Sequence, residues 1–166
     1  MACSSGDDDP APTPAPGTID PPADSQAIRA VDLGQNPDVQ RALAQAGSGR
    51  IEPSTIVYGD VTGDLREEAL VPISSGGTLG NVAYLVFTSS GTNASLVLTR
   101  TPDRGNAGGL KMTIEDGVLV ETAAEFGPSD PLCCPSVTSR TSFRWDGSKL
   151  QVLREDLIQA TPGPKQ

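Results

Sequence analysis

The sequence predicts an α+β domain that is mainly β, with one curved antiparallel sheet of about six to eight strands and a single N-terminal helix packed on it. Turn signals recur roughly every 8 to 15 residues in the last two thirds of the chain, and the apolar residues between them do not recur at helical spacing. Two Asp-Gly pairs, Asp116-Gly117 and Asp146-Gly147, separate apolar runs as hairpin turns do. Such short connections join antiparallel neighbours, because parallel strands need longer crossovers.

A helix of about three turns is predicted over residues 36–47. Asn36 is a capping residue, Pro37 suits the first helical position, and Asp38 places an acid in the first turn. Gly47 is a typical residue at which a helix ends. The apolar residues recur at helical spacing and form one narrow stripe that is expected to lie against the sheet: Val39, Ala42, Leu43 and Ala46.

The strands are predicted from apolar runs that turn residues separate. The run at residues 81–87 is apolar on both faces and is expected to be the central strand. Pro72, inside the run at residues 69–73, suggests an edge position or a bulge. The other predicted strands contain residues 56–58, 96–98, 110–114, 118–120, 143–145 and 150–152.

Composition divides the 166 residues into a tether, one domain and a tail. Residues 1–26 contain six of the 15 prolines and five acids without a base, so a disordered Pro/Asp-rich tether is expected there. A single α+β domain is expected over residues 27–158, and a disordered tail over residues 159–166. The formal net charge of −9 and the lack of a basic cluster argue against nucleic acid as a partner.

The start of the chain is typical of a bacterial lipoprotein whose signal peptide has been removed. Cys3 follows the small residue Ala2 and precedes a flexible spacer, the arrangement in which the cysteine is acylated. Cys3 is therefore the predicted lipidation site, with the membrane as partner through a lipid anchor and an extracytoplasmic location. The alternative is an ordinary chain start with a chance cysteine.

An acidic stretch between two predicted strands has the spacing of a calcium loop. Asp60, Thr62, Asp64 and Glu68 place oxygen-bearing side chains at the first, third, fifth and ninth positions. Ca²⁺ binds six to eight oxygens, so these residues are the predicted metal ligands and Ca²⁺ is the possible cofactor. Leu65 departs from this pattern, because a calcium loop usually has glycine at its sharp turn. The alternative is an acidic turn whose side chains cap their own backbone amides.

Cys133 and Cys134 are adjacent, and in an exported protein thiols are expected to be oxidised. With Cys3 assigned to lipid, a disulfide between Cys133 and Cys134 is predicted. Its Cα atoms lie about 3.8 Å apart across a trans peptide, so the bond is strained and easily reduced. Free buried thiols, redox chemistry and soft-metal capture are the alternatives.

No enzymatic activity is predicted. The sequence contains no histidine, which excludes Ser-His-Asp and Cys-His arrangements as well as imidazole metal sites. The densest carboxylate cluster is Asp64, Glu67 and Glu68, in a turn that is expected to be exposed. An exposed carboxylate does not acquire the raised pKa that a general acid needs.

Several segments resemble the LppP/LprE group of bacterial lipoproteins. They are residues 58–69 with the acidic turn, residues 76–86, residues 130–136 with the adjacent cysteines, and residues 143–147 with Trp-Asp-Gly. The resemblance covers roughly residues 35 to 153. It implies an envelope-anchored domain and carries over no catalytic residues.

Three hypotheses for function follow. The first is a non-enzymatic envelope-anchored lipoprotein domain with a binding or structural role, whose partner is an unidentified ligand or envelope protein. The second is a secreted module that Ca²⁺ stabilises through Asp60–Glu68. The third is a redox-gated protein that uses Cys133 and Cys134.

Overall fold

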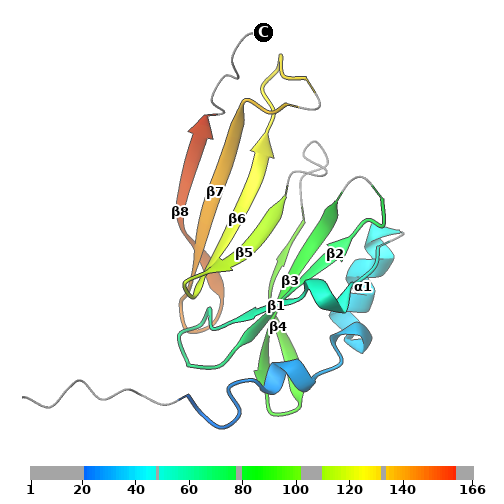
Figure 1. Cartoon of the computed structure of the whole chain (residues 1–166), viewed down its shortest axis with the longest axis vertical. Coiled ribbons are helices and arrows are strands. Elements are labelled where there is room, and N and C mark those ends of the chain that lie inside the picture. The colour runs from blue at the N-terminus through cyan, green and yellow to red at the C-terminus, as the bar shows by residue number, and fades with distance from the viewer. Residues whose placement is uncertain (1–20, 48, 78–79, 102–109, 132–133, 160–166) are drawn as a thin grey trace, which may run out of the picture.

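The computed structural model describes residues 21–47, 49–77, 80–101, 110–131 and 134–159. Eight strands form two four-stranded antiparallel sheets in the orders β1-β2-β3-β4 and β5-β6-β7-β8 (Figure 1). The prediction of a mainly β, antiparallel fold with one α-helix is confirmed in this part of the chain. The prediction of one curved sheet is wrong, because the eight strands divide into two sheets.

The first sheet, sheet A, contains β1 (Val57–Gly59), β2 (Glu68–Ser74), β3 (Asn81–Ser90) and β4 (Asn93–Arg100). The second, sheet B, contains β5 (Lys111–Glu115), β6 (Val118–Glu125), β7 (Val137–Trp145) and β8 (Leu150–Gln159). The helical segments are α1 (Pro37–Ala46) and the short 3-10 helices Ala27–Ala30, Leu33–Gln35 and Pro53–Thr55.

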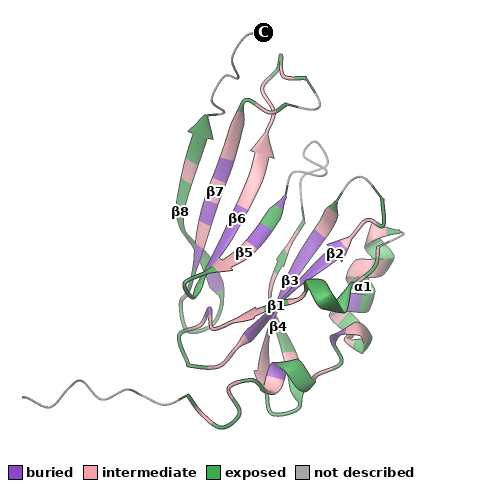
Figure 2. Ribbon diagram, in the orientation of Figure 1, coloured by how far each residue is buried: buried purple, intermediate pink, exposed green. Residues whose placement is uncertain are grey.

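The division into two sheets has a physical cause in β2 and β3, which are apolar on both faces. A strand of this kind needs a cover on each side, and a single helix covers only one. The helical layer packs on one face through Val39, and the cluster there includes Val71 and Leu85. Sheet B packs on the other face, where Leu70 and Val86 meet Leu119 and Phe143 (Figures 1 and 2). The result is three layers in the order helices, sheet A, sheet B.

Helix α1 forms as the sequence predicts. The Asn36 side chain accepts a hydrogen bond from the Asp38 backbone N–H at 2.9 Å, and Pro37 is the first helical residue. Gly47 ends the helix with a φ of 74°, in the left-handed region. Val39 is fully buried against sheet A.

Both predicted Asp-Gly hairpins occur, with different turns. Asp116 and Gly117 have φ values of 50° and 76° between paired Glu115 and Val118, as a two-residue hairpin turn requires. The second loop has four residues, because β7 pairs with β8 up to Trp145 and Leu150. There the Asp146 carboxylate accepts hydrogen bonds from the backbone N–H groups of Lys149 and Ser148, which lower the pKa of Asp146 to about 2.

The described part of the expected tether, residues 21–26, contacts the domain. The Ser25 carbonyl accepts a hydrogen bond from the Glu67 backbone N–H at 2.8 Å. Asp24 pairs with Arg66 at 3.3 Å between Oδ1 and Nε. Ile28, two residues further on from the expected tether, is fully buried against sheet A. The rest of the expected tether, residues 1–20, and residues 160–166 of the expected tail lie outside the described residues.

Candidate functional site

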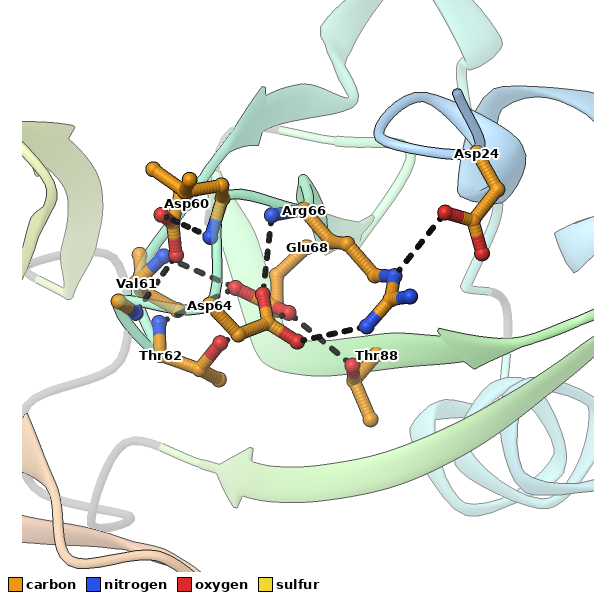
Figure 3. A network of polar contacts seen from close by, with 10 residues as sticks. Asp24, Asp60, Val61, Thr62, Asp64, Arg66, Glu68 and Thr88 are labelled. Atoms are coloured by element: carbon orange, nitrogen blue, oxygen red, sulfur yellow. Dashed lines mark hydrogen bonds and ion pairs between the residues drawn. The ribbon is translucent and has the colours of Figure 1, made fainter. Parts of the chain in front are cut away.

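The acidic turn between β1 and β2 binds its own backbone amides. The Asp60 carboxylate accepts hydrogen bonds from the N–H groups of Gly63 and Leu65, at 2.6 and 2.9 Å. Asp64 accepts one from the Arg66 N–H at 2.9 Å (Figure 3). Leu65 has a φ of 65°, so the chain adopts a left-handed conformation at the position where a glycine suits such a turn.

Glu68, the first residue of β2, lies beneath this turn. It is fully buried, and its carboxylate accepts hydrogen bonds from the N–H groups of Val61 and Thr62 at 2.9 and 3.2 Å. The Thr88 hydroxyl of β3 donates a further one at 3.0 Å (Figure 3). Burial raises the pKa of Glu68, and these donors oppose the rise. The expectation that Glu68 is exposed is therefore wrong, because its position at the start of β2 places it inside the sheet.

The four predicted calcium ligands do not all turn toward one point. Among the described residues, no three acidic or thiol side chains converge as metal ligands do. The carboxylates of Asp60 and Glu68 accept hydrogen bonds from backbone N–H groups of the turn. Calcium binding through Asp60, Thr62, Asp64 and Glu68 stays a prediction. The observed hydrogen bonds of Glu68 join the turn, through Val61, to Thr88 of β3.

The predicted cysteine sites lie mostly outside the described residues, which include neither Cys3 nor Cys133. Cys134 is exposed, and its backbone N–H donates to the Pro131 carbonyl at 2.9 Å. In the same loop the Asp130 carboxylate accepts from the N–H groups of Gly127 and Ser136, which lower the pKa of Asp130. The lipid anchor and the disulfide both stay predictions.

The structure contains a cleft that the sequence analysis missed, of about 240 Å³ between the two sheets. It lies toward the ends of β6, β7 and β8 that project beyond sheet A (Figure 1). Sheet A contributes the end of β4, and sheet B contributes side chains of β6, β7 and β8 together with Leu110, which directly precedes β5. The lining residues are Arg100, Thr101, Leu110, Glu121, Ala123, Glu125, Ser139, Thr141, Val152 and Glu155.

An ion pair between the sheets forms the base of this cleft. The Arg100 guanidinium donates to both carboxylate oxygens of Glu121, with N–O distances of 2.5 and 2.6 Å. Glu121 is buried, with 5% of its surface exposed, and Arg100 lies 5.6 Å from the centre of the Phe143 ring. The two-point contact fixes the guanidinium in one orientation. Arg100 thus neutralises Glu121 and joins β4 to β6.

The Thr141 hydroxyl is the most unusual group in the cleft. Thr141 is 7% exposed, and its side chain has no hydrogen-bond partner in the part of the chain that the structure describes. No fully enclosed side-chain oxygen there lacks a partner, so the Thr141 oxygen is reachable from the cleft. Its neighbour Ser139 is satisfied, because it donates to Glu125 at 3.1 Å. A hydroxyl that opens into a cleft without a protein partner is available to a ligand or an ordered water.

Glu125 and Glu155 line the same cleft, and neither has a basic partner among the described residues. Counted over the described lining residues, these two and Glu121 give three carboxylates against the guanidinium of Arg100, a formal charge of −2. Glu121, Thr141 and Glu155 lie side by side because they are paired across β6, β7 and β8. The sequence carried a partial signal for this cleft, since Glu121 and Glu125, like Ser139 and Thr141, are an even number of positions apart and so fall on one face of a strand.

Comparison of this chain with protein-family models, with curated proteins and with solved structures finds no match. In the described residues, no helix has the length and apolar character needed to cross a membrane.

Proposed function

We propose that this chain is a non-enzymatic, envelope-anchored lipoprotein domain that binds a small polar ligand in the cleft between its two sheets. The observation that carries the binding role is Thr141, a residue only 7% exposed whose hydroxyl opens into the cleft without a hydrogen-bond partner among the described residues. A concave site with a few convergent polar groups is the usual form of a small-molecule site.

Binding suits these residues better than catalysis does. General acid–base catalysis needs a group with an adjusted pKa at the reaction site. The acid whose pKa burial raises is Glu68, and it lies beneath the acidic turn rather than in the cleft. In the cleft, Arg100 and Glu121 hold each other. The sequence contains no histidine that could act as a base there.

The lipid anchor rests on Cys3 and on the Pro/Asp-rich segment that follows it. The arrangement of the domain suits such an anchor. The dark blue segment with which the described chain begins lies at the opposite end of the molecule from the projecting ends of β6, β7 and β8 (Figure 1). A domain held by its N-terminus would therefore present the cleft away from the membrane.

The anchor is tested on the protein purified from its own cells. Mass spectrometry of the N-terminal peptide is expected to find an acyl modification on Cys3, and Cys3→Ala is expected to move the protein from the membrane to the soluble fraction. An unmodified Cys3 in the native protein would overturn the anchor.

The binding role is tested by NMR of the ¹⁵N-labelled chain in the presence of mixtures of small polar metabolites. We expect concentration-dependent shifts at Thr141 and its cleft neighbours, and Thr141→Val to weaken binding while the fold is kept. Val matches Thr in shape and lacks only the hydroxyl. A full survey of metabolites that moves no cleft resonance would contradict the binding role.

A further inference from the structure

We infer that the ligand of the cleft is a small organic cation that carries a primary amine. This inference rests on the proposed binding role and names the chemistry of that site. Two independent observations lead to it. The carboxylates of Glu125 and Glu155 have no basic partner among the described residues, and the side chain of Thr141, a residue 7% exposed, turns an unpartnered hydroxyl into the cleft.

The placement of the polar groups favours a ligand that reaches several of them. Thr141 of β7 is paired with Glu121 on one side and with Glu155 on the other. Directly paired residues on one face lie about 5 Å apart at Cβ, so the Thr141 hydroxyl lies between two acidic positions. Glu125 is four residues along β6 from Glu121, on the same face and roughly 13 Å away. An ammonium group donates three hydrogen bonds, and carboxylates and a hydroxyl oxygen accept them.

Other ligand classes fit the cleft less well. An anion would need a basic group, and among the described lining residues the only guanidinium, that of Arg100, is already bound at two points by Glu121. A metal ion would need converging ligands, and no three acidic or thiol side chains converge among the described residues. The volume of about 240 Å³ corresponds to roughly eight molecules of liquid water, which sets the ligand at the size of a small diamine.

Three probes of equal chain length test the inference: putrescine, succinate and erythritol. They are titrated into the full chain by calorimetry and by NMR, at low and at high salt. We expect saturable binding of putrescine at the cleft that weakens with salt, and no binding of the dianion succinate. Glu125→Gln and Glu155→Gln are each expected to weaken putrescine binding about tenfold, since each removes a charged acceptor.

The matched control is Glu115→Gln, which makes the same change at an exposed residue that pairs with Arg140 on the other face of sheet B. It should leave putrescine binding unchanged. If erythritol binds in the cleft and putrescine does not, the inference that the ligand is a cation is wrong, and the proposed binding role still stands. The inference of a cationic ligand would also be overturned by a second result. In that result, putrescine changes chemical shifts over the whole surface, and the Glu125→Gln, Glu155→Gln double variant shows the same changes. Failure of every probe and metabolite to reach the cleft would instead overturn the binding role itself.

Discussion

Replacing Glu68 by alanine tests whether its carboxylate holds the acidic turn in place. The substitution leaves the N–H groups of Val61 and Thr62 and the Thr88 hydroxyl without their acceptor. An unsatisfied buried donor costs about 1–3 kcal/mol, and the lost methylenes leave a small cavity. The desolvation of the buried carboxylate, visible in its raised pKa, offsets part of this loss. We expect Glu68→Ala to lower the free energy of unfolding by about 2–4 kcal/mol.

Glu68→Gln separates hydrogen bonding from charge. The Gln carbonyl still accepts from Val61 and Thr62, and its NH₂ donates to the Thr88 hydroxyl, so the free energy of unfolding at pH 7 should stay within about 1 kcal/mol of the original. The pKa of Glu68 is raised above its ordinary value of 4.5, so the folded state binds the proton more tightly. The original protein therefore gains stability as the pH falls through the folded-state pKa toward 4.5, and the Gln variant lacks this gain.

Urea unfolding followed by the fluorescence of Trp145, the single tryptophan, measures both variants at neutral and mildly acidic pH. The urea midpoint of Glu68→Ala should fall by about 1–2 M. Glu67→Ala is the matched control at the preceding position, where the solvent-screened ion pair with Arg29 contributes little to stability. An alanine variant as stable as the original, or a Gln variant as unstable as the alanine variant, would refute the reasoning.

Four further changes test other parts of the fold. Leu65→Gly should raise the free energy of unfolding by up to about 1 kcal/mol in urea, because it relieves the positive φ at an exposed side chain; a loss would contradict the strain. The Asp146 carboxyl should titrate near pH 2 by NMR, and its contribution to stability should be lost as the pH falls from 3.8 toward 2; an ordinary pKa would disprove its hydrogen bonds. Ile28→Ala should cost about 2–4 kcal/mol in urea, and a neutral result would mean that the segment does not pack. Millimolar Ca²⁺ should leave the melting temperature unchanged, because no three acidic side chains converge among the described residues; a rise that a chelator reverses would establish the calcium site.

Local features of the fold were predictable from the sequence because they depend on neighbouring residues. The cap at Asn36 and the turn at Asp116-Gly117 are set by side chains within a few positions. The division into two sheets depends on residues far apart, such as Leu70 and Phe143, that meet only across the layers. The one sequence clue was the run at residues 81–87, whose two apolar faces required two covers.

In the candidate sites, too, the features set by neighbouring residues were predictable and those set by distant residues were not. The acidic turn was found from its spacing, but the burial of Glu68 depends on Thr88, twenty residues away in β3. The cleft depends on the register that places Thr141 between Glu121 and Glu155, and on Arg100 from the other sheet. No local pattern contains this information, because strand register and sheet stacking arise only when the chain is folded.

The double covering of sheet A gives consecutive side chains separate surroundings. In β2, Leu70 belongs to the layer shared with sheet B, whereas its neighbour Val71 belongs to the layer shared with α1. The same alternation continues in β3 with Tyr84 and Leu85. A protein engineer can therefore redesign the helical side through one set of alternate positions and leave the side that packs on sheet B untouched.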